Sequence, residues 1–257
     1  RDILRALGEK IPVVWDANND RWNTGRTAML AFDSGCTHHA VIQDDAVVPR
    51  DLVEGLPLIL SKIPPDVPLC GYIGRLRPMP GTIARLVKAA EQRKASFITM
   101  HTLNWGVLIV VPTAAIPEMI AYSDTLTHID NYDRRLSRFW EYSAQKEVWY
   151  TWPSIVDHMD GESLVPGRYG ANSARKKRVA YRFLGREESV LDVDWSGPVI
   201  REKELMPLRQ FRYQRPDKQL LIAHNETTGE MRYIKPQERW KITVYHKRGW
   251  KILEPGG

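Results

Sequence analysis

The sequence predicts an α/β fold in which a mainly parallel sheet is covered by helices on both faces. Up to about residue 165, short apolar runs of strand length alternate with segments whose apolar residues recur at helical spacing. Such alternation is typical of parallel strands joined by helices. After Pro198 the pattern changes to short strand-like segments separated by turns. We therefore expect a main domain over residues 1–198 and a small β appendage over residues 199–257.

The elements of the main domain follow from apolar runs, caps and prolines. Thr24 is expected to cap the first helix, and Pro64-Pro65 to stop the second. The expected strands are 11–15, 40–42, 69–73, 96–100 and 107–111. The expected helices are 25–32, 50–60, 83–92, 116–126 and 133–142. In the appendage, residues 209–215, 220–224, 230–234 and 240–246 are expected to be strands.

Composition restricts the class of protein. Two cysteines among 257 residues make neither a disulfide framework nor a zinc-ligand cluster, which favours a reducing, cytoplasmic setting. The longest apolar run, residues 105–112, is too short to cross a bilayer. We expect a protein without membrane contact that is a monomer or a small homo-oligomer.

The basic excess is confined to the end of the chain. Residues 199–257 hold 13 Lys and Arg against 7 Asp and Glu, a net charge of +6, whereas the preceding 198 residues hold 24 of each. This asymmetry favours an anionic partner at the C-terminal region. The alternative is a solvated β surface rich in Lys and Arg.

The most informative segment is an apolar run, residues 40–42, that leads to Gln43 and the paired acids Asp44 and Asp45. Two adjacent carboxylates at the end of a strand repel each other unless a cation or a hydrogen-bonded ligand shares them. A divalent metal that carries a diphosphate suits such a pair. The alternative is a turn or capping role ahead of Pro49 and Arg50.

Four motifs in order give the chain a family resemblance. They are residues 40–48 (AVIQDDAVV), 104–106 (NWG), 131–135 (NYDRR) and 152–158 (WPSIVDH). They resemble motifs of GT-A-fold glycosyltransferases, particularly the lipopolysaccharide-type glycosyltransferase family 25 and related glycosyltransferases of actinobacteria and their phages. The likeness covers roughly residues 10–195, with Gln43 where the lipopolysaccharide enzymes usually carry Glu. It implies a GT-A-like, Rossmann-like sheet and transfer of a sugar from a nucleotide sugar, expected to be a UDP-sugar.

The resemblance also implies a metal site. Mn²⁺ or Mg²⁺ would neutralise the leaving diphosphate, with Asp45 as the carboxylate ligand and Asp44 binding the donor's ribose or supporting the metal. His158 would be the second ligand and would favour Mn²⁺, with Asp160 as its competitor. A structural role for this histidine remains the alternative.

Asp133 is the candidate general base. An inverting transfer needs a carboxylate or a histidine within hydrogen-bond reach of the acceptor hydroxyl. Asp133 stands at the expected start of a helix, where the helix dipole favours its ionised form. A plain capping role is the alternative, and Asp130 is the local competitor.

The donor is expected at the carboxyl ends of the strands. Asp16, after the expected strand 11–15, would contact base, ribose or phosphate, and so would Trp22, Thr24 and Arg26. A turn-stabilising role is the alternative for Asp16. Trp105 and Gly106 would let the backbone approach the sugar, since glycine has no side chain to block it. Trp149 and Trp152 are expected either to stack on a sugar or base or to pack in the core.

The C-terminal tail, residues 199–257, supplies the residues that are expected to bind the acceptor. Arg212, Arg215, Lys247 and Arg248 alternate with aromatic residues, a pattern in which cations contact phosphates and rings stack on bases. The basic run 175–178 would extend that surface. With the phage-type resemblance, DNA carrying hydroxymethylated pyrimidines becomes the expected acceptor, its target base flipped out of the stack. A protein or glycan acceptor, and a non-catalytic sugar-nucleotide or DNA-binding module, are the competing hypotheses.

Overall fold

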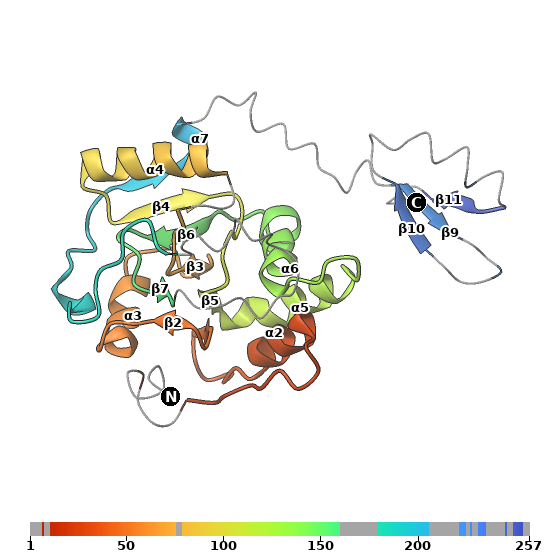
Figure 1. Ribbon diagram of the computed structural model, residues 1–257, viewed down its shortest axis with the longest axis horizontal. Helices are drawn as coiled ribbons and strands as arrows, with labels where there is room; N and C mark the ends of the chain where they lie inside the picture. The colour runs from red at the N-terminus through yellow and green to blue at the C-terminus, as the bar shows by residue number, and fades with distance from the viewer. Residues whose placement is uncertain are drawn as a thin grey trace, which may run out of the picture. The chain divides into compact units, whose positions relative to one another are not determined.

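The computed structural model describes residues 7, 11–75, 79–159 and 179–205, together with 221–224, 227, 231–234, 245 and 249–253 near the C-terminus. The chain forms two units, Arg1–Leu205 and Met206–Gly257 (Figure 1). The boundary therefore lies after Leu205 and not after residue 198. The reason is that the segment just past Pro198 forms a strand of the main sheet.

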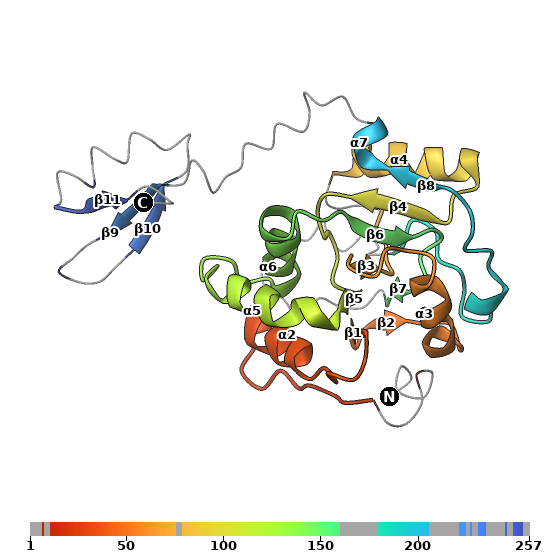
Figure 2. The same ribbon diagram turned by 180° about the vertical axis from the view of Figure 1, so that it is seen from behind.

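The main unit is built on a six-stranded mixed sheet with the order β1-β5-β3-β6-β4-β8. Its strands are β1 (His38–Ile42), β3 (Leu69–Cys70), β4 (Phe97–Met100), β5 (Leu108–Pro112), β6 (Val148–Thr151) and β8 (Val199–Arg201). The pairs β3·β6 and β4·β8 are parallel, whereas β1·β5, β5·β3 and β6·β4 are antiparallel. The α/β class is thus confirmed, but the expectation of a mainly parallel sheet is wrong. Figure 2 shows β8 beside β4 at one edge of this sheet.

The central strands are buried on both faces. Every residue of β3, β4, β5 and β6 is buried, which requires cover above and below the sheet. This explains why these strands read as continuous apolar runs in the sequence. One expected strand is absent: residues 11–15 form no strand, and Val13 and Trp15 are 45% and 82% exposed. Without a partner strand, their apolar pattern does not produce a sheet element.

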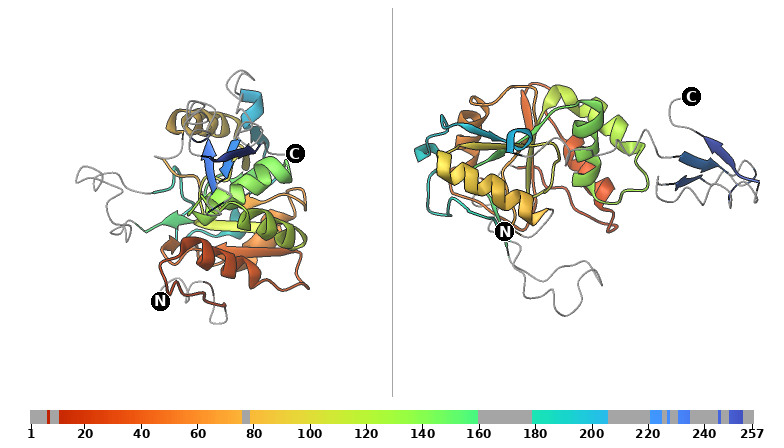
Figure 3. Two further views of the ribbon diagram at one scale, coloured as in Figure 1. Left: turned by 90° about the vertical axis from the view of Figure 1, so that its right-hand side faces the viewer. Right: turned by 90° about the horizontal axis from the view of Figure 1, so that it is seen from above.

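The helices follow their expected positions with shifted ends. The α-helices are α2 (Arg21–Leu30), α3 (Leu52–Leu60), α4 (Pro80–Arg93), α5 (Ile116–Asp124), α6 (Tyr132–Arg138) and α7 (Glu202–Leu205). Short 3₁₀ turns are η1 (Thr113–Ala115) and η3 (Val190–Asp192), and a π-helical turn, η2 (Phe139–Ser143), continues α6. The first helix is capped by Asp20, whose side chain accepts from the Asn23 N–H at 2.9 Å, and not by Thr24. Figure 3, from above, shows α4 lying along the strands, and its neighbours are β4, β8 and α7.

A two-stranded ribbon stands beside the main sheet. β2 (Ala46–Val47) pairs antiparallel with β7 (Asp157–His158), with Ala46 opposite His158. The ribbon follows directly from the turn after β1, so it fixes the paired acids next to a segment more than a hundred residues further along the chain.

The C-terminal unit holds a three-stranded antiparallel sheet of order β10-β9-β11. Its strands are β9 (Leu221–His224), β10 (Met231–Ile234) and β11 (Lys251–Leu253). Two of the expected strands agree with β9 and β10, and β11 was not anticipated. The expected strand at 209–215 lies outside the described residues, as does that at 240–246 apart from Tyr245. In the described part of the chain, no helix combines the length and apolar character needed to cross a bilayer.

Candidate metal centre and active site

Asp45 and His158 meet at the start of the β2·β7 ribbon. The His158 Nε2 atom lies 3.0 Å from Asp45 Oδ2, and the Met159 N–H donates to the Asp45 carbonyl oxygen at 2.7 Å. The His158 side chain is 12% exposed and that of Asp45 42%. The two residues that the sequence analysis assigned to the metal are therefore direct neighbours.

The hydrogen bonding of His158 demands positive charge at this contact. Its Nδ1 atom lies 2.8 Å from the Met159 carbonyl oxygen. Because a carbonyl only accepts, Nδ1 carries the proton there, and a neutral ring then turns the Nε2 lone pair toward the carboxylate. Two acceptors at 3.0 Å repel each other unless a proton or a metal cation lies with them.

The pair fits a divalent cation. Histidines that bind metals usually donate their other ring N–H to a carbonyl or carboxylate, as His158 does. Asp45 Oδ1 is buried and receives no hydrogen bond from the described residues, so it retains an unused acceptor. Two neighbouring ligands of an octahedral cation with bonds of about 2.1 Å are roughly 3.0 Å apart, which matches the pair.

Within the described ranges, no group of three or more His, Cys, Asp or Glu side chains forms a metal cluster. Asp160, the competing ligand, lies outside the described residues. A cation at Asp45 and His158 would thus take its remaining ligands from water and from the oxygens of a bound substrate.

Tyr132 connects this pair to the candidate base. Its hydroxyl donates to the Gly106 carbonyl oxygen at 2.5 Å and lies 3.5 Å from Gln43 Nε2. Burial raises the pKa of Tyr132, and the charges of Asp133 and Asp45 raise it further, so both carboxylates lie within electrostatic reach of this phenol. The motifs around the paired acids, the NWG turn and the NYDRR segment therefore converge on one side chain.

Asp133 lies in the first turn of α6, not at its cap. Asn131 occupies the N-cap position, and its Oδ1 atom accepts from Arg21 Nη1 at 3.1 Å. Asp133 Oδ1 accepts from the Arg134 N–H at 2.8 Å. Burial raises the pKa of Asp133, while the nearby charges of Arg134 and Arg21 oppose that shift. A carboxylate with a raised pKa is a stronger base than an ordinary carboxylate, which suits the role of a proton acceptor.

The wall beside Tyr132 is formed by Trp105 and Gly106. Trp105 packs edge-on against Tyr72 and Tyr150, each with ring centroids 5.8 Å apart. The Cys70 thiol donates to the Trp105 carbonyl oxygen at 3.4 Å, and burial raises its pKa to about 12, so it remains a neutral donor. A Cβ at Gly106 would lie 2.5 Å from the Tyr132 hydroxyl oxygen, which explains the glycine.

Four residues that were expected to contact the donor have other roles in the structure. Trp22 Nε1 donates to Asp124 Oδ1 at 3.1 Å, and Arg26 holds both carboxylate oxygens of Asp124 at 3.0 and 3.1 Å. These bonds fasten α2 to α5. Asp16 is exposed and accepts from the Asp20 N–H at 3.1 Å, a turn-stabilising role, and Thr24 lies half-buried within α2.

The remaining predicted residues are more scattered. Asp44 is exposed beside Asp45, Asp130 is exposed, and Trp149 and Trp152 are 5% and 3% exposed, so both indoles are core residues. The tail cations Arg212, Arg215, Lys247 and Arg248 lie outside the described residues, as does the run 175–178. Sequence reasoning assigned no role to Arg21 or to Tyr132, although Tyr132 lies inside the NYDRR motif.

Comparison with known proteins identifies no relative. No family model matches the chain, and no curated protein or solved structure matches it either.

Proposed function

We propose that this chain is a metal-dependent glycosyltransferase that moves a sugar from a nucleotide-sugar donor to a hydroxyl acceptor. The observation that carries the proposal is the contact between Asp45 and His158. It pairs a carboxylate with a histidine whose other nitrogen is bound to a carbonyl, an arrangement that is satisfied by a proton or a metal cation and suits Mn²⁺ or Mg²⁺. The same contact alone also suits a metal site of other chemistry, so the transfer itself rests on the neighbouring Asp133 and the family resemblance.

The donor side of the site is supplied by the turn after β1 and by the ribbon. Asp45 and His158 would hold the cation, which when bound supplies positive charge to the departing diphosphate. Asp44 stands exposed beside the pair and is available to a ribose or a second donor hydroxyl. Trp105 and Gly106 form the wall along which the sugar would lie.

Asp133 would take the proton of the acceptor hydroxyl. As that oxygen forms its bond to the anomeric carbon, the bond from the carbon to the phosphate oxygen breaks, and its electron pair leaves with the diphosphate. The raised pKa of Asp133 makes it a stronger base than an ordinary carboxylate. The charges of Arg21 and Arg134 favour its ionised form and oppose the effect of burial.

For the acceptor, we propose DNA that carries hydroxymethylated pyrimidines. This proposal is supported by the net charge of +6 on residues 199–257, because the first 198 residues carry no net charge. A base inside a duplex would have to be flipped out to reach the cleft.

The test is a screen of hydroxymethylpyrimidine DNA with several nucleotide sugars and Mn²⁺, read by mass spectrometry. A gain of one hexose or pentose supports the proposal, and unmodified DNA with every donor contradicts the DNA acceptor. Donor hydrolysis without acceptor then serves as the second readout. If Mn²⁺ produces no hydrolysis above background, the transferase itself is refuted.

Asp45→Asn and Asp44→Asn form a matched pair of variants for the metal site. Both lose one carboxylate charge in the same turn, but only Asp45 contacts His158. We expect Asp45→Asn to weaken Mn²⁺ binding, measured by titration calorimetry, by tenfold or more, and Asp44→Asn to change it by less than about threefold. Equal losses would show that net charge, and not ligation, accounts for any binding.

A further inference from the structure

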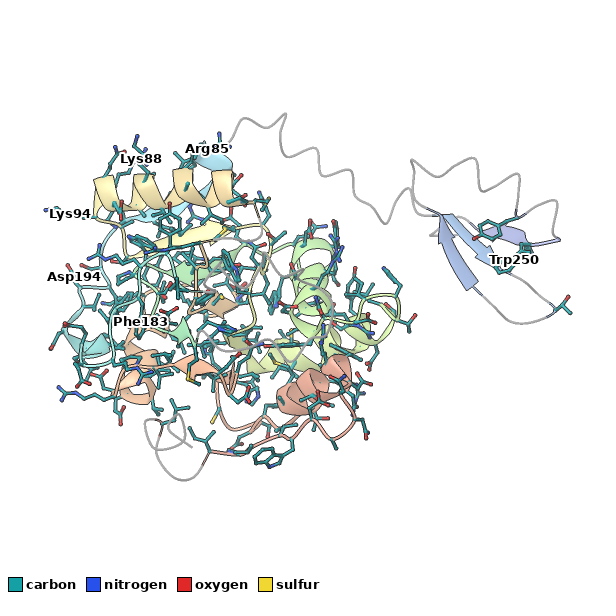
Figure 4. The ribbon with its side chains drawn as sticks, in the orientation of Figure 1. Arg85, Lys88, Lys94, Phe183, Asp194 and Trp250 are labelled. Carbon is teal, nitrogen blue, oxygen red and sulfur yellow. The ribbon has the colours of Figure 1, made fainter. Side chains whose placement is uncertain are left out.

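We propose that the outer face of α4 binds the phosphate backbone of a nucleic acid. The surface, called here the α4 ridge, consists of Arg85, Lys88, Arg93, Lys94 and Arg182. The inference rests on the DNA acceptor of the proposed function and assigns it a contact surface in the main unit, apart from the tail. Figure 4 shows Arg85 and Lys88 on the outer side of α4 and Lys94 at its end, with Asp194 near that end.

The amphipathic pattern of α4 produces this face. Its apolar residues Ile83, Leu86, Val87 and Ala90 are buried against the sheet. The cations of the helix are all exposed, as is Arg182 across the hollow at the helix end. That hollow is lined by Lys94, Ser96, Trp152, Pro153, Arg182 and Asp194, among others, so Lys94 and Arg182 stand at a common depression.

The cations of the ridge have no acidic partner in the described part of the chain. Five other cations of the main unit are ion-paired, namely Arg26, Arg138, Lys146, Arg201 and Lys203. Two carboxylates belong to the same surface, Glu91 and Asp194, which leaves five positive charges against two negative ones, a net +3. Asp194 is itself occupied, because it accepts from the Ser196 N–H at 2.9 Å and from its hydroxyl at 2.5 Å.

Lys94 gives a second, independent observation. It follows the last residue of α4 with φ +52° and ψ +46°, in the left-handed region where glycine is the usual residue. A lysine there costs about 1 kcal/mol relative to glycine. The backbone alone therefore favours glycine, whereas the chain has an exposed cation at the end of α4, beside the hollow that Arg182 also lines.

The character of the ridge selects nucleic acid over other anionic partners. A helix that binds a membrane surface needs exposed apolar residues to insert, and a protein interface usually centres on aromatic or aliphatic anchors. The exposed large hydrophobic side chains of the described residues all lie outside α4: Val13, Trp15, Leu30, Val53, Met159 and Leu191. A convex row of cations without apolar anchors matches a phosphate backbone, where electrostatics supply most of the affinity.

The ridge and the candidate active site lie at opposite edges of the sheet. α4 contacts β4 and β8, whereas the paired acids follow β1 at the other end of the strand order. Five steps between neighbouring strands at about 4.8 Å span about 24 Å. One turn of duplex DNA, about 34 Å long, is longer than that separation.

The test is equilibrium binding of a fluorescent duplex to the full chain over a range of salt concentrations, without donor or metal. Arg85→Gln/Lys88→Gln is compared with Arg50→Gln/Arg186→Gln, which removes two exposed cations away from α4 and has the same net charge. We expect the ridge variant to bind about tenfold more weakly at 0.1 M salt, with a log–log salt slope shallower by about 2. The control should bind within about threefold of the parent with an unchanged slope. Equal effects of the two variants, or no effect of either, overturn the proposal.

Lys94→Gly separates binding from folding. It removes one cation and the left-handed strain together, so duplex affinity should fall while the melting temperature stays the same or rises. Unchanged affinity overturns the role of Lys94 in the ridge. Loss of binding to anionic phosphatidylserine vesicles in the ridge variant, with duplex binding intact, would replace nucleic acid by a membrane. Because binding is measured without turnover, an inactive protein that still binds through α4 contradicts the transferase and leaves the ridge standing.

Discussion

Removal of one hydroxyl in Tyr132→Phe tests whether this side chain holds the active-site wall. In the described chain the buried Gly106 carbonyl oxygen has its hydrogen bond from the Tyr132 hydroxyl, at 2.5 Å. Phenylalanine keeps the ring and leaves that acceptor without its donor, a loss of about 1–3 kcal/mol. For a unit of about 200 residues, 1 kcal/mol corresponds to about 2–4 °C, so the melting temperature should fall by about 2–12 °C.

Calorimetric or fluorescence-monitored melting measures this effect, with Tyr142→Phe as the control. The Tyr142 hydroxyl accepts from Arg138, but Arg138 retains Glu141 at 2.9 Å, so the control should lose less than about 0.5 kcal/mol. If Tyr132→Phe melts with the parent, the hydroxyl does not hold the wall.

A double-mutant cycle sharpens the argument. In Gly106→Ala the new methyl carbon would lie 2.5 Å from the Tyr132 hydroxyl oxygen. That clash is eased when the hydroxyl is absent, although the next ring carbon, at 2.9 Å, remains close. The double variant should therefore be about 1 kcal/mol more stable than the sum of the single losses implies. Additive losses would refute the close contact between these two residues.

Three further predictions concern charge and packing. The raised pKa of Asp133 means that the folded state binds its proton more tightly than the unfolded chain does, so ionisation of this residue lowers stability as pH rises through its folded pKa. Asp133→Asn should therefore have a higher melting temperature than the parent at pH 8, and the difference should close toward pH 3. The variant should also lose transfer activity. Burial also raises the pKa of Glu202, which is 3% exposed. Glu202→Gln should therefore flatten the decline of the melting temperature between pH 5 and 8. An unchanged slope of melting temperature against pH would contradict the burial of its charge. Gly25→Ala should destabilise by about 1–3 kcal/mol despite the better helix propensity of alanine, because its methyl would lie 2.5–2.7 Å from Tyr132 ring atoms, whereas Gly81→Ala in open space should be neutral or stabilising in the same urea titration.

The sequence predicted most elements but not how the strands pair. Apolar runs predicted β4 and β5, whereas β6 was not predicted as a strand although it is equally buried. An apolar run shows that a strand is buried without showing the direction of its neighbour. The alternation of strands and helices therefore suggested parallel pairing where three of the five pairs are antiparallel. The apolar run at 11–15 failed for a related reason, because a strand also needs an edge to pair with, and sequence spacing does not reveal one.

The candidate site was predictable where chemistry is local and hidden where it depends on packing. Paired acids after a strand pointed to a cation, and His158 was assigned to the same cation from the resemblance; the β2·β7 ribbon brings them to 3.0 Å. The assignment of Trp22 and Arg26 to the donor did not anticipate Asp124, which binds both from α5. The sequence does not show whether such a tryptophan or arginine donates to the phosphate of a ligand or to a carboxylate of the protein itself.

The Asp45–His158 pair does not lie where the rule for ligand sites in α/β sheets would place a metal site. That rule places ligands at the carboxyl ends of parallel strands, where successive loops meet at one edge. β1 is an edge strand that pairs antiparallel with β5, so it is not a parallel strand of this kind. Asp45 follows it, and its partner His158 arrives on a ribbon outside the sheet. Asp16 follows no strand and accordingly ends in a surface turn. In this mixed sheet, Asp45 therefore differs from Asp16 in having a second segment paired beside its turn, with Ala46 opposite His158.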